Sequence, residues 1–160
     1  MFRIGFGTDI HRLVLGRPLV IGGVRIESDL GADGHSDADI LMHAAADAIL
    51  GALALGDLGA HFPNDEERWR NAESSQFLSH AVGLVRERGY AVENLDSVID
   101  LEKPKLRPHI DAMRANLAAA LLVEIDSVSV KAKTGETVDA VGERRAVKAE
   151  AVVLLRKIVA

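Results

Sequence analysis

The alternation of extended and helical patterns along one uninterrupted chain constrains the fold more than any other feature. Stretches with alternating or continuous apolar residues predict strands, and Ala- and Leu-rich stretches that are apolar on one side predict helices. We expect strands over residues 2–13, 91–102, 127–133 and 145–158, and helices over residues 38–54, 74–88 and 109–122. Because no internal repeat or linker divides the 160 residues, we expect a single domain, 1–160.

Glycine breaks the first part of the chain into short extended pieces. Gly16-Arg17-Pro18 ends the first strand, and Gly22-Gly23 separates residues 19–21 from residues 24–26. We interpret this region as a β-hairpin between residues 2–13 and 19–21, followed by a small extended piece. An antiparallel hairpin excludes a purely parallel sheet. The expected fold class is therefore α+β, or mixed α/β, with a mixed sheet of four to five strands and helices packed on one face.

Two further stretches predict loops. Residues 27–36 are acidic and contain two glycines, and residues 57–71 contain a proline and several charges. At the end of the first loop, Ser36 or Asp37 is the expected N-cap of the first helix, because short polar side chains accept from the free amides there.

Composition and charge exclude several classes of protein. A net charge of −5 argues against a nucleic-acid partner, which requires a basic face. The absence of cysteine excludes disulfides and thiolate ligands, so any metal site must use histidine and carboxylate. No apolar run approaches the ~20 residues of a membrane span, and the N-terminus lacks the apolar stretch of a signal peptide. We expect a cytoplasmic protein with no membrane partner.

Three residues form a candidate metal site. Asp9 and His11 lie two residues apart on the first predicted strand, so their side chains point to the same face. His43 lies on a polar stripe of the first helix, between Asp39 and Asp47 at intervals of four residues. Two histidines and one carboxylate leave a fourth coordination position open, which is the pattern of a catalytic zinc.

Spacing alone leaves simpler interpretations of these residues open. A D-x-H pair by itself is a weak indication of a metal site, and a lone histidine on a helix is most often an ordinary surface residue. The motifs around the three residues favour the metal site.

These motifs run through the whole chain. In order they are Gly5–His11 (GFGTDIH), Pro18–Ile26 (PLVIGGVRI), Gly34–Asp39 (GHSDAD), Leu55–Gly59 (LGDLG), Pro104–Leu106 (PKL) and Val130–Glu136 (VKAKTGE). The series closely resembles the 2-C-methyl-D-erythritol 2,4-cyclodiphosphate synthase family of the non-mevalonate isoprenoid pathway.

The resemblance implies an enzyme, a phosphorus–oxygen lyase. Its reaction would convert 4-diphosphocytidyl-2-C-methyl-D-erythritol 2-phosphate into 2-C-methyl-D-erythritol 2,4-cyclodiphosphate and release CMP. The resemblance also implies a homotrimer with active sites between neighbouring subunits, and some members of the family bind an isoprenoid diphosphate on the trimer axis. The implied cofactors are Zn²⁺, or another divalent cation, at Asp9, His11 and His43, and Mg²⁺, or Mn²⁺, at Glu136.

The same resemblance assigns catalytic and binding roles. His35 and Thr134 correspond to positions that stabilise the transition state, and residues 101–107 correspond to a cytidine pocket. A proline-stiffened loop suits such a pocket because its backbone can recognise a base edge with little ordering entropy. The substrate-binding residues implied are Asp9, His11, His35, Ser36, Asp57, Leu58, Gly59, Phe62, Glu66, Leu101, Pro104, Lys105, Leu106, Arg107, Lys133, Thr134, Gly135 and Glu136.

Two stretches depart from the family's common pattern. Many relatives read F-P-D-T-D where this chain reads FPNDE over residues 62–66, which leaves the contacts of that loop open. Many bacterial relatives carry an arginine where this chain has Glu143, so a phosphate contact there does not transfer. Arg144 or Arg145 is the candidate substitute.

Two other functions fit the same residues. A zinc phosphoesterase would use the three ligands to activate water and would yield an open-chain phosphate. A non-catalytic trimeric binding protein would hold a structural metal, for which a fourth protein ligand is expected. His61, His80 and His109 lie in unrelated segments of the sequence.

Overall fold

A curled five-stranded sheet forms the centre of the fold, in the computed structural model that describes residues 1–63, 69 and 72–158. Its strand order is β4-β1-β7-β5-β6. The five strands are β1 (Phe2–Leu15), β4 (Leu30–Ala32), β5 (Tyr90–Asp100), β6 (Val128–Lys133) and β7 (Ala146–Lys157). The β5–β6 pair is parallel and the other pairs are antiparallel. The expectation of a mixed sheet is therefore confirmed.

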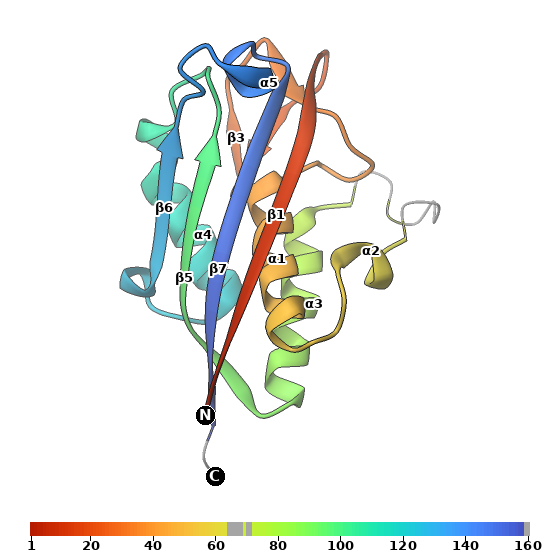
Figure 1. Ribbon diagram of the computed structural model, residues 1–160, viewed down its shortest axis with the longest axis vertical. Helices are drawn as coiled ribbons and strands as arrows, with labels where there is room; N and C mark the ends of the chain where they lie inside the picture. Colours follow the sequence, from red (N-terminus) through yellow and green to blue (C-terminus); the bar gives the residue numbers. More distant parts are fainter. Residues whose placement is uncertain (64–68, 70–71, 159–160) are drawn as a thin grey trace.

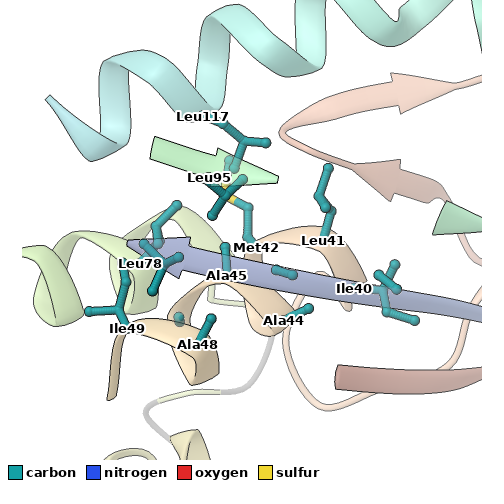
Figure 2. Close-up of a cluster of buried hydrophobic side chains, with 14 of the residues drawn as sticks. Ile40, Leu41, Met42, Ala44, Ala45, Ala48, Ile49, Leu78, Leu95 and Leu117 are labelled. Carbon is teal, nitrogen blue, oxygen red and sulfur yellow. The ribbon is translucent and has the colours of Figure 1, made fainter. Parts of the chain in front are cut away.

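Three helices pack on one face of the sheet, as expected (Figure 1). They are α1 (Ile40–Ala52), α3 (Ser74–Glu87) and α4 (Ile110–Leu121), with the 3-10 helices η2 (Arg107–His109) and η3 (Ile125–Ser127) at the two ends of α4. Figure 2 shows how Leu41, Leu78 and Leu117, from the three helices, gather with Leu95 from β5 in the buried core. Small aliphatic side chains let these layers approach closely.

The hairpin is where the structure differs most from the expectation. β2 (Leu19–Ile21) pairs with β3 (Val24–Ile26) in a separate two-stranded sheet, and not with β1. Gly22 and Gly23 join them with φ angles of 59° and 70°, a turn conformation that glycine adopts without steric cost. β1 pairs instead with β4, which lies inside the predicted loop at residues 27–36. A strand of three residues is too short to show a period.

Two local expectations are also wrong. The N-cap of α1 is Asp39 and not Ser36 or Asp37, because the Asp39 carboxylate accepts from the amides of Leu41 and Met42. The predicted loop at 57–71 contains the one-turn helix α2 (Leu58–His61), and another short helix, α5 (Asp139–Gly142), precedes β7.

No helix in the described part of the chain has the length and apolar character needed to cross a membrane.

The face of the sheet away from the helices carries a cluster of exposed apolar side chains. Alternate residues of β1 point to this side, and several large side chains there are exposed: Phe2, Ile4, Phe6 and Ile10 from β1, and Val152 from β7. Ile4 is 73% exposed and Phe6 is 58% exposed. A contiguous apolar surface of this kind is typical of an interaction face.

Candidate metal centre

The inner face of β1 begins with glycines and continues with the two predicted metal ligands. Gly5, Gly7, Asp9 and His11 alternate with exposed residues and therefore point toward α1. A Cβ atom on Gly5 would lie 1.8 Å from the carbonyl oxygen of Ala48, and one on Gly7 would lie 2.1 Å from that of Ala44. Without side chains at these positions the helix backbone rests directly on the strand, which brings the next turn of α1 over Asp9.

That turn carries His43, and the three predicted ligands meet. Asp9 Oδ2 lies 2.9 Å from His43 Nδ1 and 3.0 Å from His11 Nε2, and the two ring nitrogens lie 3.3 Å apart. Ligand atoms about 2.0–2.1 Å from a tetrahedral zinc ion lie roughly 3.3 Å from one another. The group therefore has the donor types and the spacing that a zinc ion requires. Among the described residues, these three side chains form the group whose ligand atoms lie close enough together to hold a metal ion. The group contains three candidate ligands and not four.

Burial and mutual contact shift the pKa values of this group. Burial alone would raise the pKa of Asp9, but the hydrogen bonds and charges of His11 and His43 outweigh it and hold that pKa well below its usual range. Burial alone would lower the pKa of His11, but contact with Asp9 raises it. A carboxylate that stays ionised beside two imidazoles is suited to bind a cation.

The three ligands line a pocket of about 480 Å³, which we call the metal-side pocket. Six other predicted residues line it as well: His35, Ser36, Asp57, Leu58, Gly59 and Phe62. The structure thus brings these nine residues together, while their roles in binding and catalysis stay predictions. Glu66 lies outside the described residues.

Four residues of the metal-side pocket were not predicted as site residues: Gly34, Asp47, Trp69 and Phe77. Asp47 had a signal in the sequence, since it follows His43 by one helical turn on the same polar stripe. Burial and neighbouring carboxylates raise its pKa, although a hydrogen bond from the amide of Leu58, 2.6 Å away, favours the ionised form. Trp69 and Phe77 come from distant segments, and the helical period of Phe77 with Ala81 and Val85 indicated only a core-facing residue of α3.

The remaining predicted residues gather elsewhere, where the parallel strands β5 and β6 end. A second pocket of about 640 Å³, which we call the edge pocket, is lined by Leu101, Lys105, Leu106, Arg107, Lys133, Thr134 and Glu136 among others. The Thr134 hydroxyl donates to Glu136 Oε1 at 2.6 Å. Pro104 lines a neighbouring hollow with Lys105 and Arg144, and Gly135 packs against the backbone of Gly142.

The two pockets are separate within one chain. The metal-side pocket is built on β1 and α1, whereas the edge pocket is built on β5 and β6, and β7 lies between β1 and β5 in the sheet. One chain therefore does not place the predicted zinc ligands and Glu136 in a common cavity.

Arg144 and Arg145, the candidate substitutes for the arginine that many relatives carry at the position of Glu143, both form ion pairs. Arg144 pairs with Asp29 at 2.5 Å beside the hollow that contains Pro104, and Arg145 pairs with its neighbour Glu143 at 2.6 Å. Arg144 is the better placed of the two for a phosphate, since it lines the same hollow as Lys105.

Comparison with known proteins identifies the family of this chain. A model of the YgbB family matches residues 2–156. The protein named 2-C-methyl-D-erythritol 2,4-cyclodiphosphate synthase in Salinibacter ruber is 56% identical over 149 residues, 93% of this chain and 95% of that one. The protein of the same name in Synechococcus elongatus is 52% identical over 154 residues, 96% of each chain.

Solved structures lead to the same family. The synthase in its CDP-bound form superposes with a TM-score of 0.89 at 43% identity, over 96% of this chain and 100% of that chain. Sequence and fold thus agree, and the chain belongs to the YgbB family, that of the 2-C-methyl-D-erythritol 2,4-cyclodiphosphate synthases.

Proposed function

We propose that this chain cyclises 4-diphosphocytidyl-2-C-methyl-D-erythritol 2-phosphate to 2-C-methyl-D-erythritol 2,4-cyclodiphosphate and releases CMP, using zinc at Asp9, His11 and His43 and magnesium at Glu136. The observation that carries the proposal is the three-ligand group in the metal-side pocket, found in an enzyme of this synthase family. Three protein ligands leave a coordination position for a phosphate oxygen.

The edge pocket is the proposed place of the cytidine diphosphate part of the substrate. A related structure with CDP bound supports a cytidine ligand. The pocket combines apolar side chains with the cations Lys105, Arg107 and Lys133, which suit a base next to phosphates. Glu136 supplies the single carboxylate that magnesium prefers when phosphate oxygens and water complete its shell.

The proposed reaction depends on how the chain orients the substrate more than on proton transfer by its side chains. The substrate's own ionised 2-phosphate is the nucleophile, so no strong general base is needed. Bound divalent cations would screen the repulsion between phosphates and polarise a phosphate oxygen. The chain's own contribution is to hold the 2-phosphate in line with the second phosphorus, and to stabilise the charge that develops on the phosphoryl oxygens with hydrogen bonds from His35 and Thr134.

A homotrimer is part of the proposal. The exposed apolar face around Phe6 needs a partner, and two pockets on different parts of one chain need a neighbour to form one site. An isoprenoid diphosphate on the trimer axis is a further proposed ligand of this arrangement. The single domain over residues 1–160 and the cytoplasmic location also stay predictions.

The direct test is His43→Ala. We expect loss of stoichiometric zinc and of CMP release with the fold retained, because two ligands do not hold the ion and the orientation of the phosphate is lost. Zinc content by elemental analysis, CMP release and circular dichroism are the measurements. His80→Ala is the matched control, since His80 is exposed on α3 and does not line the metal-side pocket. Normal turnover by zinc-free His43→Ala protein would sink the assignment.

Product analysis separates the two alternatives. Phosphorus NMR of the product mixture shows a cyclic diphosphate if the proposal holds, and an open-chain phosphate if the chain is a zinc phosphoesterase. A structural metal predicts no turnover at all and no inhibition by phosphate analogues, and it requires a fourth ligand beyond the three found among the described residues.

A further inference from the structure

The two nitrogens of the His43 ring face different surroundings. Nδ1 points toward Asp9 and His11, whereas Nε2 lies 2.8 Å from the hydroxyl of Ser74 and 3.3 Å from that of Ser36. Ser74 is the first residue of α3, lies 31 residues further along the chain and is completely buried. A buried hydroxyl at this distance is a specific partner for the ring and not a chance neighbour.

Ser74 is in turn held by Asp37. Its hydroxyl donates a short hydrogen bond to Asp37 Oδ1, and its backbone amide lies 3.2 Å from both carboxylate oxygens. The amide of Asp37 donates to the carbonyl of Ala72 at 3.0 Å. Since the N-cap residue of α3, Glu73, makes no side-chain cap, Asp37 caps this helix from the loop before α1.

The chain of contacts has only one consistent direction. An ionised carboxylate only accepts, so the single hydroxyl proton of Ser74 goes to Asp37. Ser74 Oγ can then only accept from His43, which places a proton on Nε2. Nδ1, which lies 2.9 Å from Asp9 Oδ2, is then the ring nitrogen that can bind a cation on the side where Asp9 and His11 converge.

We propose that Ser74 and Asp37 are positioning residues of the metal centre, which fix the tautomer and the orientation of His43 for metal binding through Nδ1. The inference rests on the proposed metal role of His43. It explains why the loop at residues 35–37 is tied to the start of α3, and it matches the general finding that metal-binding histidines donate their other ring N–H to an outer partner.

Asp37 and Asp39 lie close together in the sequence but contact different partners, and this difference supports the positioning role of Asp37. Asp39 is buried, whereas Asp37 is half-buried, and the Asp39 carboxylate caps α1 and accepts from the amides of Gly22 and Gly23 at 2.8 and 2.6 Å. Asp39 therefore attaches the β2–β3 hairpin to α1, while Asp37 serves α3 and His43. Of these two aspartates, only Asp37 is expected to influence metal binding.

The test is the zinc affinity of the full-length protein, measured by competition with a chelator. Ser74→Ala removes the hydroxyl but keeps the amide that Asp37 caps, and we expect it to weaken zinc binding by about 10- to 100-fold. Asp37→Asn should cause a smaller loss, because an amide oxygen still accepts from Ser74. Ser79→Ala is the control, since Ser79 is exposed on the same helix. The zinc affinity of this variant should match that of the wild type.

A double-mutant cycle distinguishes positioning from general loosening. In the His43→Ala background, Ser74→Ala should change the remaining zinc affinity by less than about 2-fold, because the residue through which it acts is gone. An equal loss in both backgrounds overturns the proposal, and so does unchanged zinc affinity in Ser74→Ala and Asp37→Asn. A wild-type protein that takes up no zinc overturns the metal site itself, and this inference with it.

Discussion

The residues of the three-ligand group are held in place by contacts within their own chain, whereas the charged residues that line the edge pocket are exposed. Asp9, His11 and His43 are half-buried, and their ring nitrogens and carboxylate oxygens contact one another or buried hydroxyls. In the edge pocket Lys133 and Glu136 are exposed, and Thr134 contacts only the neighbouring Glu136 among the hydrogen bonds of described residues.

The difference teaches where rigidity is needed. A metal with three protein ligands needs donors placed to within about half an ångström, which packed elements such as β1 and α1 provide. A pocket that is completed by a neighbouring subunit can stay open in one chain. Variants that damage one pocket and spare the other, or that separate neighbouring chains, test this difference.

The largest effect is expected from Gly7→Ala. A Cβ atom would lie 2.1 Å from the Ala44 carbonyl oxygen, so α1 must move away from β1 and take His43 with it. We expect a loss of roughly 3 kcal/mol or more in unfolding free energy, together with weaker zinc binding. Denaturant unfolding and zinc titration measure the two effects.

Gly83→Ala in α3 is the matched control. Nothing lies within 4 Å of its added Cβ, so the higher helix propensity of alanine should stabilise the protein by up to about 1 kcal/mol. If Gly7→Ala unfolds like the wild type and binds zinc normally, close strand–helix packing does not position the site.

Gly7 also shows how much of the site could be predicted from sequence. Period two on β1 places Gly7, Asp9 and His11 on one face, and the helical stripe supplies His43, so local pattern brings the three proposed ligands together once the helix is packed on the strand. The surrounding motifs were still needed to favour a metal site. The roles assigned to the loops came from family resemblance. Ser74 and Asp37 were missed because Ser74 lies 31 residues from His43 and 37 residues from Asp37 along the chain. Contacts over such separations leave no periodic pattern in the sequence.

The same dependence on local periodicity explains which elements of the fold could be predicted. Long periodic segments were predicted correctly, whereas β4, α2 and α5 are too short to show a period. The N-cap of α1 was misplaced because Ser36, Asp37 and Asp39 can all cap a helix, and only tertiary contacts with Gly22 and Gly23 select Asp39.

The next effect separates assembly from zinc binding. Phe6→Asp puts a charge in the middle of the exposed apolar face, so we expect a shift from trimer to monomer in light scattering. Turnover should fall at least about 100-fold, as misplacement of reacting groups can cost that much. Zinc should remain near one per chain, since one chain supplies all three ligands. Gln76→Asp, on exposed α3 surface, is the control, and a Phe6→Asp monomer with full activity would show that one chain suffices.

Mixing two inactive variants tests whether the pockets act across a subunit boundary. His43→Ala damages only the metal-side pocket and Thr134→Ala only the edge pocket. When equal amounts are unfolded and refolded together, roughly a quarter of the composite sites combine two intact halves, so about a quarter of wild-type turnover should return. Each variant refolded alone provides the baseline. No recovery in mixed trimers would mean that both pockets serve one site within a single chain.

The smallest and most selective effect is expected from Glu136→Gln. The carboxylate is exposed in the edge pocket, and the change removes its charge but keeps its shape. We expect the magnesium concentration for half-maximal CMP release to rise about tenfold, or about 1.4 kcal/mol of binding, because phosphate oxygens and water supply the other magnesium ligands. Zinc content should stay at one per chain, since Glu136 lies outside the metal-side pocket. Glu124→Gln, on an exposed loop before η3, should change neither quantity. If Glu136→Gln lowers zinc content instead, the two metals are not divided between the two pockets, and the contrast between a rigid zinc centre and an open magnesium end fails.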